Sequence, residues 1–262
     1  MLNKTLIVSA MLLCLFRSLN MNAQVGEGQG AQILEQVITS AGGREACKQA
    51  GDFRASGTFS LYSGGEVTET GNADVIGSGL KRFHLTATLA NEIRVWVWKD
   101  GVGFLRARNR QPDPIGPHNL SALEGVTLPV LKIMALLDSH SRSVRLVETV
   151  TLEGKEAYRI RVTQTPTEHK ERLLLGRDSA TTDVLVERQT LSVIAIEDAI
   201  YPNSHTRESY RHSVTYGDYR AVNRAQVPFS IQEKIADQIT WGLQLNSFSS
   251  PVGPSSSDFQ LN

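Results

Sequence analysis

The residues that most often carry chemistry are scattered through this sequence rather than grouped. None of its histidines lies at the spacing that metal ligands on one helix or hairpin usually have. His84 and His212 fall in expected strands, where they could share a metal only through tertiary contact. We therefore expect no metal site and no cofactor, and histidines that are exposed or hydrogen-bonded. The six histidines are His84, His118, His140, His169, His205 and His212.

The sequence also lacks the usual patterns of nucleophilic and acid–base active sites. Its nearest approach to a Gly-x-Ser-x-Gly elbow is Gly77 to Gly79, which precedes a strand and is typical of a hairpin turn. Cys47 lies in a short amphipathic segment and has no partner signature, which indicates a small buried residue. Glu197 and Asp198 are adjacent in an expected strand, so their carboxylates should point to opposite faces. We predict no catalytic residues and a protein that is not an enzyme.

Apolar side chains, by contrast, are present in excess. An ordinary core would explain most of them. If the sheet is curled, however, its concave face needs a cover, and Leu128 to Leu137 is the segment of suitable composition. A cavity beneath this lid would suit acyl chains, because each buried methylene contributes about 0.8 kcal/mol. If the helix fills the concavity, the same residues form a packed core. The residues expected to line the cavity and lid are Phe59, Phe83, Leu85, Trp96, Leu131, Met134, Tyr158, Ile160, Phe229 and Trp241.

Two periodicities describe the elements that would position these residues. An apolar stripe at helical spacing, followed by Gly42 and Gly43, predicts a helix that ends there, with a further helical turn or two over Arg44 to Gly51. From Asp52 onward, apolar and polar residues alternate, which predicts strands with one buried face. The helical stripe consists of Ile33, Leu34, Val37, Ile38 and Ala41.

A second helix is expected from Thr127 to Leu137, with Pro129 in its first turn, after an Arg- and Pro-rich loop from Arg106 to Asn119. It is apolar nearly all round, so it must be buried on more than one side or cover an apolar surface. The chain has about 10–11 expected strands and no strand–helix–strand rhythm. The predicted fold class is mainly β with few helices (α+β): one continuous, strongly curled antiparallel sheet whose concave face is covered by a helix.

The N-terminus has the layout of a secretory signal peptide. Lys4 precedes an apolar run from Leu6 to Phe16, and Ala23 is a small residue near which cleavage is expected. The run is about a dozen residues long, whereas a membrane-spanning helix needs about 20. We therefore expect an exported protein of the periplasm, in which Cys47 is the one remaining cysteine and forms no internal disulfide.

We expect three segments: a signal peptide over residues 1–23, a single half-barrel domain over 24–248, and a C-terminal tail over 249–262. Removing residues 1–23 removes Lys4 and Arg17 but no acidic residue, so the formal charge falls from 0 to −2. A chain so close to neutral offers no electrostatic basis for binding nucleic acid.

Four motifs across the expected domain resemble those of one family: Ala41 to Ala46, Asp52 to Thr58, Tyr216 to Asn223 and Val227 to Ile231. With these motifs the chain is similar to acidobacterial proteins related to the outer-membrane lipoprotein-sorting carriers (LolA/LolB-like). The resemblance implies an unclosed barrel, or half-barrel, with helices as a lid over an apolar cavity that holds acyl chains. At Arg224 the sequence departs from the family pattern, which usually has Gly after the turn Asn, and Arg54 and Arg94 are the candidates for the family's lid-closing arginine.

The favoured hypothesis is a monomeric periplasmic carrier or binding protein for lipoprotein acyl chains or another amphiphile, with lipid or acylated protein as partner and transient membrane contact. An alternative is a structural envelope protein that binds a protein partner through an exposed sheet edge or through Arg106, Arg108 and Arg110. A hydrolase assembled from distant residues is a third hypothesis. A structure that shows whether the space beneath Leu128 to Leu137 is open or filled separates a cavity from a packed core.

Overall fold

The computed structural model describes residues 28–107, 110–140, 142–165, 181–202 and 207–260. The expected signal peptide and Arg108 lie outside these ranges. The described strands are β1 (Asp52–Ser63), β2 (Glu66–Ser78), β3 (Arg82–Thr88), β4 (Ile93–Lys99), β5 (Val102–Ala107), β6 (Asp113–Ile115), β7 (Arg142–Leu152), β8 (Lys155–Gln164), β9 (Thr181–Glu187), β10 (Val193–Ile200), β11 (Tyr210–Val222), β12 (Ala225–Ile235) and β13 (Gln238–Ser249). The helices are residues 28–40, α2 (Gly43–Ala50), α3 (Pro117–Leu123), α4 (Pro129–Asp138) and the 3-10 turn η2 (Ser256–Phe259).

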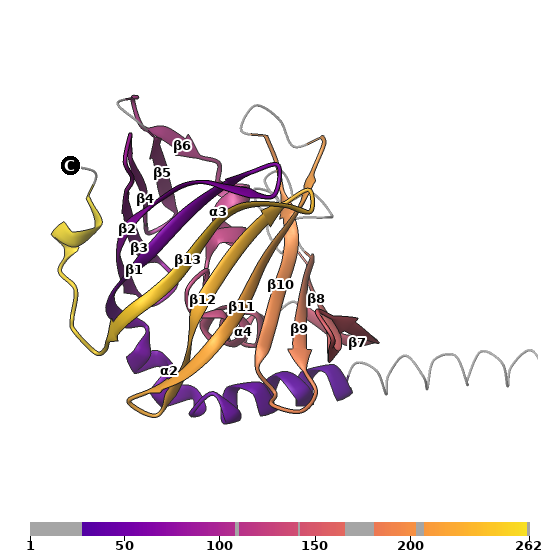
Figure 1. Cartoon of the computed structure of the whole chain (residues 1–262). Helices are drawn as coiled ribbons and strands as arrows, with labels where there is room; N and C mark the ends of the chain where they lie inside the picture. Colours follow the sequence, from indigo (N-terminus) through magenta and orange to yellow (C-terminus); the bar gives the residue numbers. More distant parts are fainter. Residues whose placement is uncertain (1–27, 108–109, 141, 166–180, 203–206, 261–262) are drawn as a thin grey trace, which may run out of the picture.

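One antiparallel sheet contains all 13 of these strands, in the order β6-β5-β4-β3-β2-β1-β13-β12-β11-β10-β9-β8-β7. The sheet is strongly curled and remains open between β6 and β7 (Figure 1). Neighbouring strands are also neighbours in sequence, with one exception: β1 pairs with β13, from Arg54 opposite Ser249 to Leu61 opposite Trp241. The predicted fold class, an unclosed antiparallel half-barrel with few helices, is therefore confirmed.

The strand count and one loop differ from the prediction of about 10–11 strands and a loop from Arg106 to Asn119. That loop segment contains β6, which pairs with β5, and the start of α3. Both elements are too short to show a period: β6 has 3 residues, one of them Pro114, and α3 has 7.

The register of the ladders defines the inner face of the sheet. Residues directly opposite each other in antiparallel strands share a face. Seven members of one such row are apolar, and the other two are glutamates, Glu69 and Glu233, so the inner face is apolar with isolated charges. The row of successive partners is Glu69, Leu61, Trp241, Glu233, Val214, Ile196, Val184, Ile160 and Leu146.

The helices cover the sheet from two directions. Helix 28–40 and α2 run along one end of the strands, and α3 and α4 lie against the inner face (Figure 1). The predicted stripe of the first helix, from Ile33 to Ala41, is buried as expected. Gly42 lets this corner approach the β11–β12 turn, since a Cβ there would lie 2.0 Å from the carbonyl oxygen of Arg224. In the described residues, none of the helices is long and apolar enough to span a bilayer.

The C-terminal segment packs on β3 and β4 through η2. Arg54 Nη2 lies 2.7 Å from Asp258 Oδ1, and the Nδ1 of His84 lies 2.6 Å from the carbonyl oxygen of Asp258. Phe259 is buried. The segment beyond β13 is thus attached to the first half of the sheet by an ion pair, by hydrogen bonds that include those of Lys99 with Ser256 and of Val252 with Asp52, and by a buried ring.

Candidate functional site

A cavity of about 310 Å³ lies beside α3, between β4 to β6 on one side and β10 to β12 on the other. We call it the α3 cavity. Its walls are mainly aliphatic and aromatic, with two carboxylates, one imidazole and one amide among them. This composition, apolar with a few convergent polar groups, is characteristic of small-molecule sites. The lining residues are Trp96, Leu105, Asp113, Pro114, Ile115, Asn119, Leu123, Ile200, His212, Glu233 and Ile235.

The polar floor of the α3 cavity belongs to a chain of buried charges that links α4 to three strands. Lys132 Nζ of α4 lies 2.6 Å from Asp198 Oδ2 of β10. The other oxygen of Asp198 is 2.8 Å from His212 Nδ1 of β11, and His212 Nε2 is 3.2 Å from Glu233 Oε1 of β12. All four residues are at most partly accessible, and the His212 ring is 1% exposed. We call Lys132, Asp198, His212 and Glu233 the ionic chain.

The sheet register explains how the ionic chain forms. Asp198 and His212 are direct cross-strand partners, as are Val214 and Glu233 one row below. His212 therefore meets Asp198 across one ladder and Glu233 diagonally across the next, which is within reach of long side chains. The two-residue period of β10 turns the neighbouring Glu197 to the opposite side, where it accepts hydrogen bonds from Arg159 and Arg211. The prediction that Glu197 and Asp198 serve different faces is confirmed.

The residues of the ionic chain stabilise one another's ionised forms. Burial would lower the pKa of His212, but hydrogen bonds to Asp198 and Glu233 outweigh this effect and raise the pKa to about 9. Burial would raise the pKa of Asp198, but Lys132 and His212 together hold it below its ordinary value. At neutral pH the imidazole is thus a cation that donates both N–H groups to carboxylates.

Lys132 also holds the α3–α4 corner. Its ammonium donates a second hydrogen bond, of 3.3 Å, to the carbonyl oxygen of Ala122. Gly125, with φ +75°, passes so close that a Cβ would lie 2.8 Å from the Cβ of Lys132. The turn between the helices, the ionic chain and the α3 cavity are therefore one packed unit.

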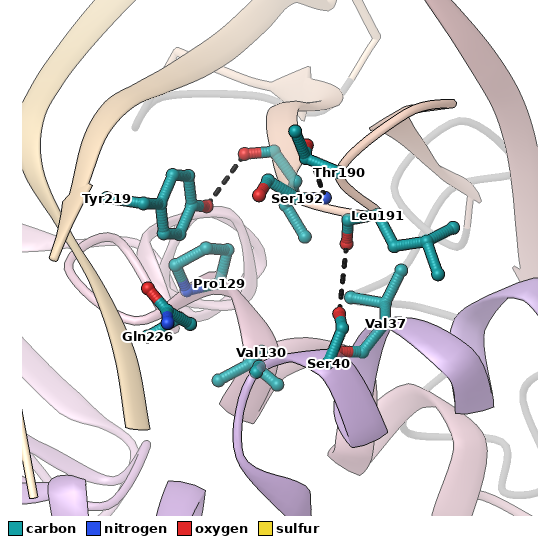
Figure 2. Close-up of a pocket in the computed structure, with 11 residues that line it drawn as sticks. Val37, Ser40, Pro129, Val130, Thr190, Leu191, Ser192, Tyr219 and Gln226 are labelled. Atoms are coloured by element: carbon teal, nitrogen blue, oxygen red, sulfur yellow. Dashed lines mark hydrogen bonds between the residues drawn. The ribbon is translucent and has the colours of Figure 1, made fainter. Parts of the chain in front are cut away.

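A second hollow, of about 260 Å³, lies where helix 28–40, the start of α4 and the β9–β10 turn meet (Figure 2). Three of its polar side chains, those of Ser40, Thr190 and Tyr219, form hydrogen bonds within the protein. Tyr219 donates a 2.7 Å hydrogen bond to the carbonyl oxygen of Val193, and Thr190 Oγ1 lies 2.9 Å from Glu187 Oε2. Ser40 lies 3.0 Å from the carbonyl oxygen of Val37. These groups stabilise the corner, so we regard the α3 cavity as the better candidate for a ligand site.

The residues predicted to line a cavity and lid belong to one core cluster on the inner face. Trp96 alone among them lines the α3 cavity. Phe59 stacks between Trp96 and Trp241, with ring centroids 5.3 and 5.7 Å away, so this aromatic group continues from the cavity wall into the core. The members packed in the cluster are Phe59, Phe83, Leu85, Leu131, Met134, Tyr158, Ile160, Phe229 and Trp241.

The helix expected to form the lid, α4, lies against the inner face of the sheet (Figure 1). α4 has 8 buried residues among its 10, as its all-round apolar composition predicts. Its side chains fill the middle of the concavity, and the α3 cavity lies under the neighbouring helix instead. Next to α4, a recess of about 80 Å³ is bordered by Lys132, Ala135 and Leu136. A seven-residue helix without an apolar stripe offered no sequence signal for this role.

The other candidate residues are distributed over several parts of the fold. His84 contacts the C-terminal segment and His212 lies in the ionic chain, so the two do not meet. His118 is buried in α3, and its Nε2 has no hydrogen-bond partner, contrary to the expectation of satisfied histidines. Arg54 pairs with Asp258, and Arg94 pairs with Glu92. Among the described residues, no group of three or more His, Cys, Asp or Glu could hold a metal ion.

The sequence signal that was missed is Lys132. A lysine in the middle of an otherwise apolar, buried helix requires a buried counter-ion, because an unpaired buried charge is too costly. Asp198 and His212, both on inward positions of expected strands, were available to supply the rest of the chain. Their pairing depends on a register that the sequence pattern leaves open.

Comparison with known proteins identifies the fold. No protein-family model and no curated protein matches the sequence. Among solved structures, a putative outer-membrane lipoprotein-sorting protein domain from Vibrio parahaemolyticus aligns with a TM-score of 0.51 and 10% identity, covering 89% of this chain and 97% of that one. A LolA superfamily protein from Nitrosomonas europaea aligns with a TM-score of 0.52 and 12% identity, covering 86% and 96%.

A DUF1329 family protein from Desulfovibrio piger aligns with a TM-score of 0.54 and 9% identity, covering 90% of this chain and 97% of that one. The near-complete coverage of all three chains shows that the whole half-barrel is shared rather than one hairpin. The chain thus has the LolA-like fold that its motifs resemble. The narrower resemblance to acidobacterial relatives stays a prediction.

Proposed function

We propose that the protein is a non-enzymatic periplasmic carrier or binding protein for an amphiphile, such as a lipid or the acyl chains of a lipoprotein. The α3 cavity carries this proposal. Its apolar walls suit an aliphatic chain, and its volume, about 310 Å³, is at the lower end of ligand sites. The lipoprotein-sorting and LolA names of two structures with the same fold agree with it. The predicted signal peptide supports the periplasmic location.

The state of His212 favours binding over hydrolysis. A general base must accept a proton, and its pKa should lie near the working pH. His212 has a pKa of about 9, and both of its nitrogens donate to carboxylates. It is therefore already protonated at neutral pH and has no lone pair to offer a nucleophile.

The core cluster extends this proposal beyond the cavity itself. We propose that a longer chain follows the aromatic group formed by Trp96, Phe59 and Trp241 and displaces side chains of the cluster, including Leu131 and Met134 of α4. The remaining predicted residues, Phe83, Leu85, Tyr158, Ile160 and Phe229, would form the surrounding wall. Movement of α3 and α4 from the inner face would admit the chain, in a monomer that touches membranes only transiently.

The test is to purify the protein gently from a periplasm and analyse an organic extract by mass spectrometry. A co-purified amphiphile is expected. Binding of an alkyl chain with an uncharged fluorescent head is then measured for the parent protein and for Leu123→Trp, which fills the α3 cavity. The variant should bind at least about tenfold more weakly, since burial of a few methylenes is lost.

The matched control is Val102→Trp, at a position that is 59% exposed and is not among the residues that line the cavity. It should bind as the parent does. Empty protein that also fails to bind the uncharged probe, or equal binding by all three proteins, would contradict the proposed function.

A further inference from the structure

The polar groups in the α3 cavity differ in what they can still offer a ligand. The cationic donor, His212, is fully engaged, and Asn119 uses one of its two amide N–H groups. The amide of Asn119 donates a 2.8 Å hydrogen bond to the carbonyl oxygen of Tyr201 and accepts one of 2.8 Å from its N–H. Both N–H groups of His212 point at carboxylates, at 2.8 and 3.2 Å. A carboxylate or phosphate ligand therefore finds no free cationic donor among these groups, only the second amide N–H of Asn119.

Acceptors, by contrast, remain available. A carboxylate can accept about four hydrogen bonds. In Glu233, Oε1 accepts from His212 and Oε2 accepts from Thr240, so both oxygens keep capacity. Asp113 of β6 adds a second carboxylate, at an exposed position of the cavity wall.

The net charge of the cavity and the adjoining ionic chain also favours a cationic ligand. The ionic chain has two positive charges, on Lys132 and His212, and two negative charges, on Asp198 and Glu233. Asp113 adds a third negative charge at the cavity wall. The cation His212 is shared between Asp198 and Glu233, so it neutralises neither completely. The cavity is therefore weakly negative, and its apolar walls strengthen electrostatic attraction there relative to water.

We infer that the α3 cavity selects a single-chain amphiphile with a primary ammonium head, which donates to Glu233 and is attracted by Asp113. The aliphatic chain lies on Trp96, Leu123 and Ile200. This inference rests on the proposed function and narrows it: a carboxylate head of the same length would place like charges together. The small volume, about 310 Å³, favours one chain over two.

The experiment compares dodecylamine, dodecanol and dodecanoate, each below its micelle concentration, by calorimetric titration of the purified protein at neutral pH and low salt. An alkylamine is protonated under these conditions, because its pKa resembles that of lysine. Dodecylamine should bind about tenfold more tightly than dodecanol, as expected for one charge-assisted hydrogen bond, and dodecanoate should bind most weakly.

Two substitutions locate the preference. Glu233→Gln keeps the shape of the side chain and should reduce the ratio of dodecylamine affinity to dodecanol affinity about tenfold, a ratio that cancels any general loss of binding. Asp113→Asn is at an exposed position that the fold does not depend on, so it should reduce the preference in a protein with unchanged stability. Asp74→Asn, on an exposed position of β2, is the matched control and should bind all three compounds as the parent does.

The results distinguish failure of the ammonium preference from failure of the proposed function. Equal affinities for the three compounds, abolished by Leu123→Trp, would overturn the ammonium preference and leave the proposed function standing. Failure of dodecanol to bind at all would count against the proposed function itself. Titration with lysophosphatidylethanolamine and lysophosphatidylcholine identifies the source of the ammonium group. Preference for the ethanolamine lipid assigns a lipid headgroup. Weak binding of both lipids, together with tight binding of dodecylamine, assigns a free amine.

Discussion

At the scale of single residues, the ionic chain determines how the interior tolerates change. Breaking a buried ion pair by removing one partner typically costs about 3–5 kcal/mol, because the other charge stays behind in the core. Lys132 and Asp198 have side chains that are 7% and 6% exposed. We expect Lys132→Met to lower the free energy of unfolding by about 3 kcal/mol, as measured by urea denaturation.

The control for this prediction is Lys155→Met. Lys155 pairs with Glu187 at 3.4 Å and is 54% exposed, and such pairs contribute about 0–1 kcal/mol. Equal losses for the two variants would mean that Lys132 is needed only for its aliphatic stem.

The raised pKa of His212 predicts a specific pH dependence. Because its folded pKa, about 9, lies above its ordinary value of 6.5, protonated His212 stabilises the fold fully below pH 6.5. This stabilisation is lost progressively as the pH rises from 6.5 through 9. The free energy of unfolding should fall by about 3 kcal/mol over this window. Denaturant titrations at a series of pH values measure it, and His212→Gln should flatten the curve; an unchanged slope in that variant would refute the assignment.

The role of each of these residues could be predicted only where it follows from the sequence close to it. The separate roles of Glu197 and Asp198 follow from the two-residue period of a strand and were foreseen. The contact of His212 with Asp198 and Glu233 depends on strand register, which involves residues far apart in sequence. Lys132 is intermediate, since its helix predicted burial but not its partner.

At the scale of elements, the β11–β12 hairpin shows a local conflict that the chain tolerates. Asn223 and Arg224 form its two-residue turn, between the paired Val222 and Ala225, and both have positive φ, of 45° and 77°. Such turns favour Asn-Gly. The left-handed conformation costs an ordinary residue about 1–2 kcal/mol. Arg224→Gly should therefore raise the free energy of unfolding by about 0.5–1 kcal/mol after the added chain entropy is subtracted.

Thermal denaturation checks this prediction. Arg145→Gly, in the extended strand β7, is the opposite case and should destabilise by about 0.5–1 kcal/mol, because glycine has only its entropy cost there. If both substitutions destabilise the protein, the strain relieved at the positive φ of Arg224 is smaller than the entropy cost of glycine.

Elements with a long periodic signal were predicted well. The first helix ends where Gly42 and Gly43 indicate, and α4 is buried nearly all round as its composition requires. β6 and α3 were not predicted, because 3 and 7 residues cannot establish a period and their neighbours determine their conformation. Since α3 borders the candidate site, the part of that site formed by Asn119 and Leu123 was not predicted, and the role of α4 as a lid stays a prediction.

At the scale of the molecule, hairpin alternation predicts almost the whole sheet, because each strand pairs with its neighbour in sequence. It does not predict the pairing of β1 with β13, which joins the β1–β6 and β7–β13 meanders into one sheet and leaves β6 and β7 as the end strands. Strand twist contributes to the curl of the joined sheet. The sequence therefore predicted the class of the fold, and the order of its strands required the structure.

The pairing of the first strand with the last also sets an order of events during biogenesis. Arg54 of β1 can pair with Ser249 of β13 only after all the strands between them have been synthesised. Contacts so distant along the chain close late and slowly, because loop-closure entropy must be overcome first. In refolding followed by pulsed hydrogen exchange, amides between β1 and β13 should gain protection after those of the β7–β8 and β11–β12 hairpins. Simultaneous protection would contradict this order. Until they pair, β1 and β13 are exposed edges of two separate half-sheets, and such edges are open to pairing with other chains.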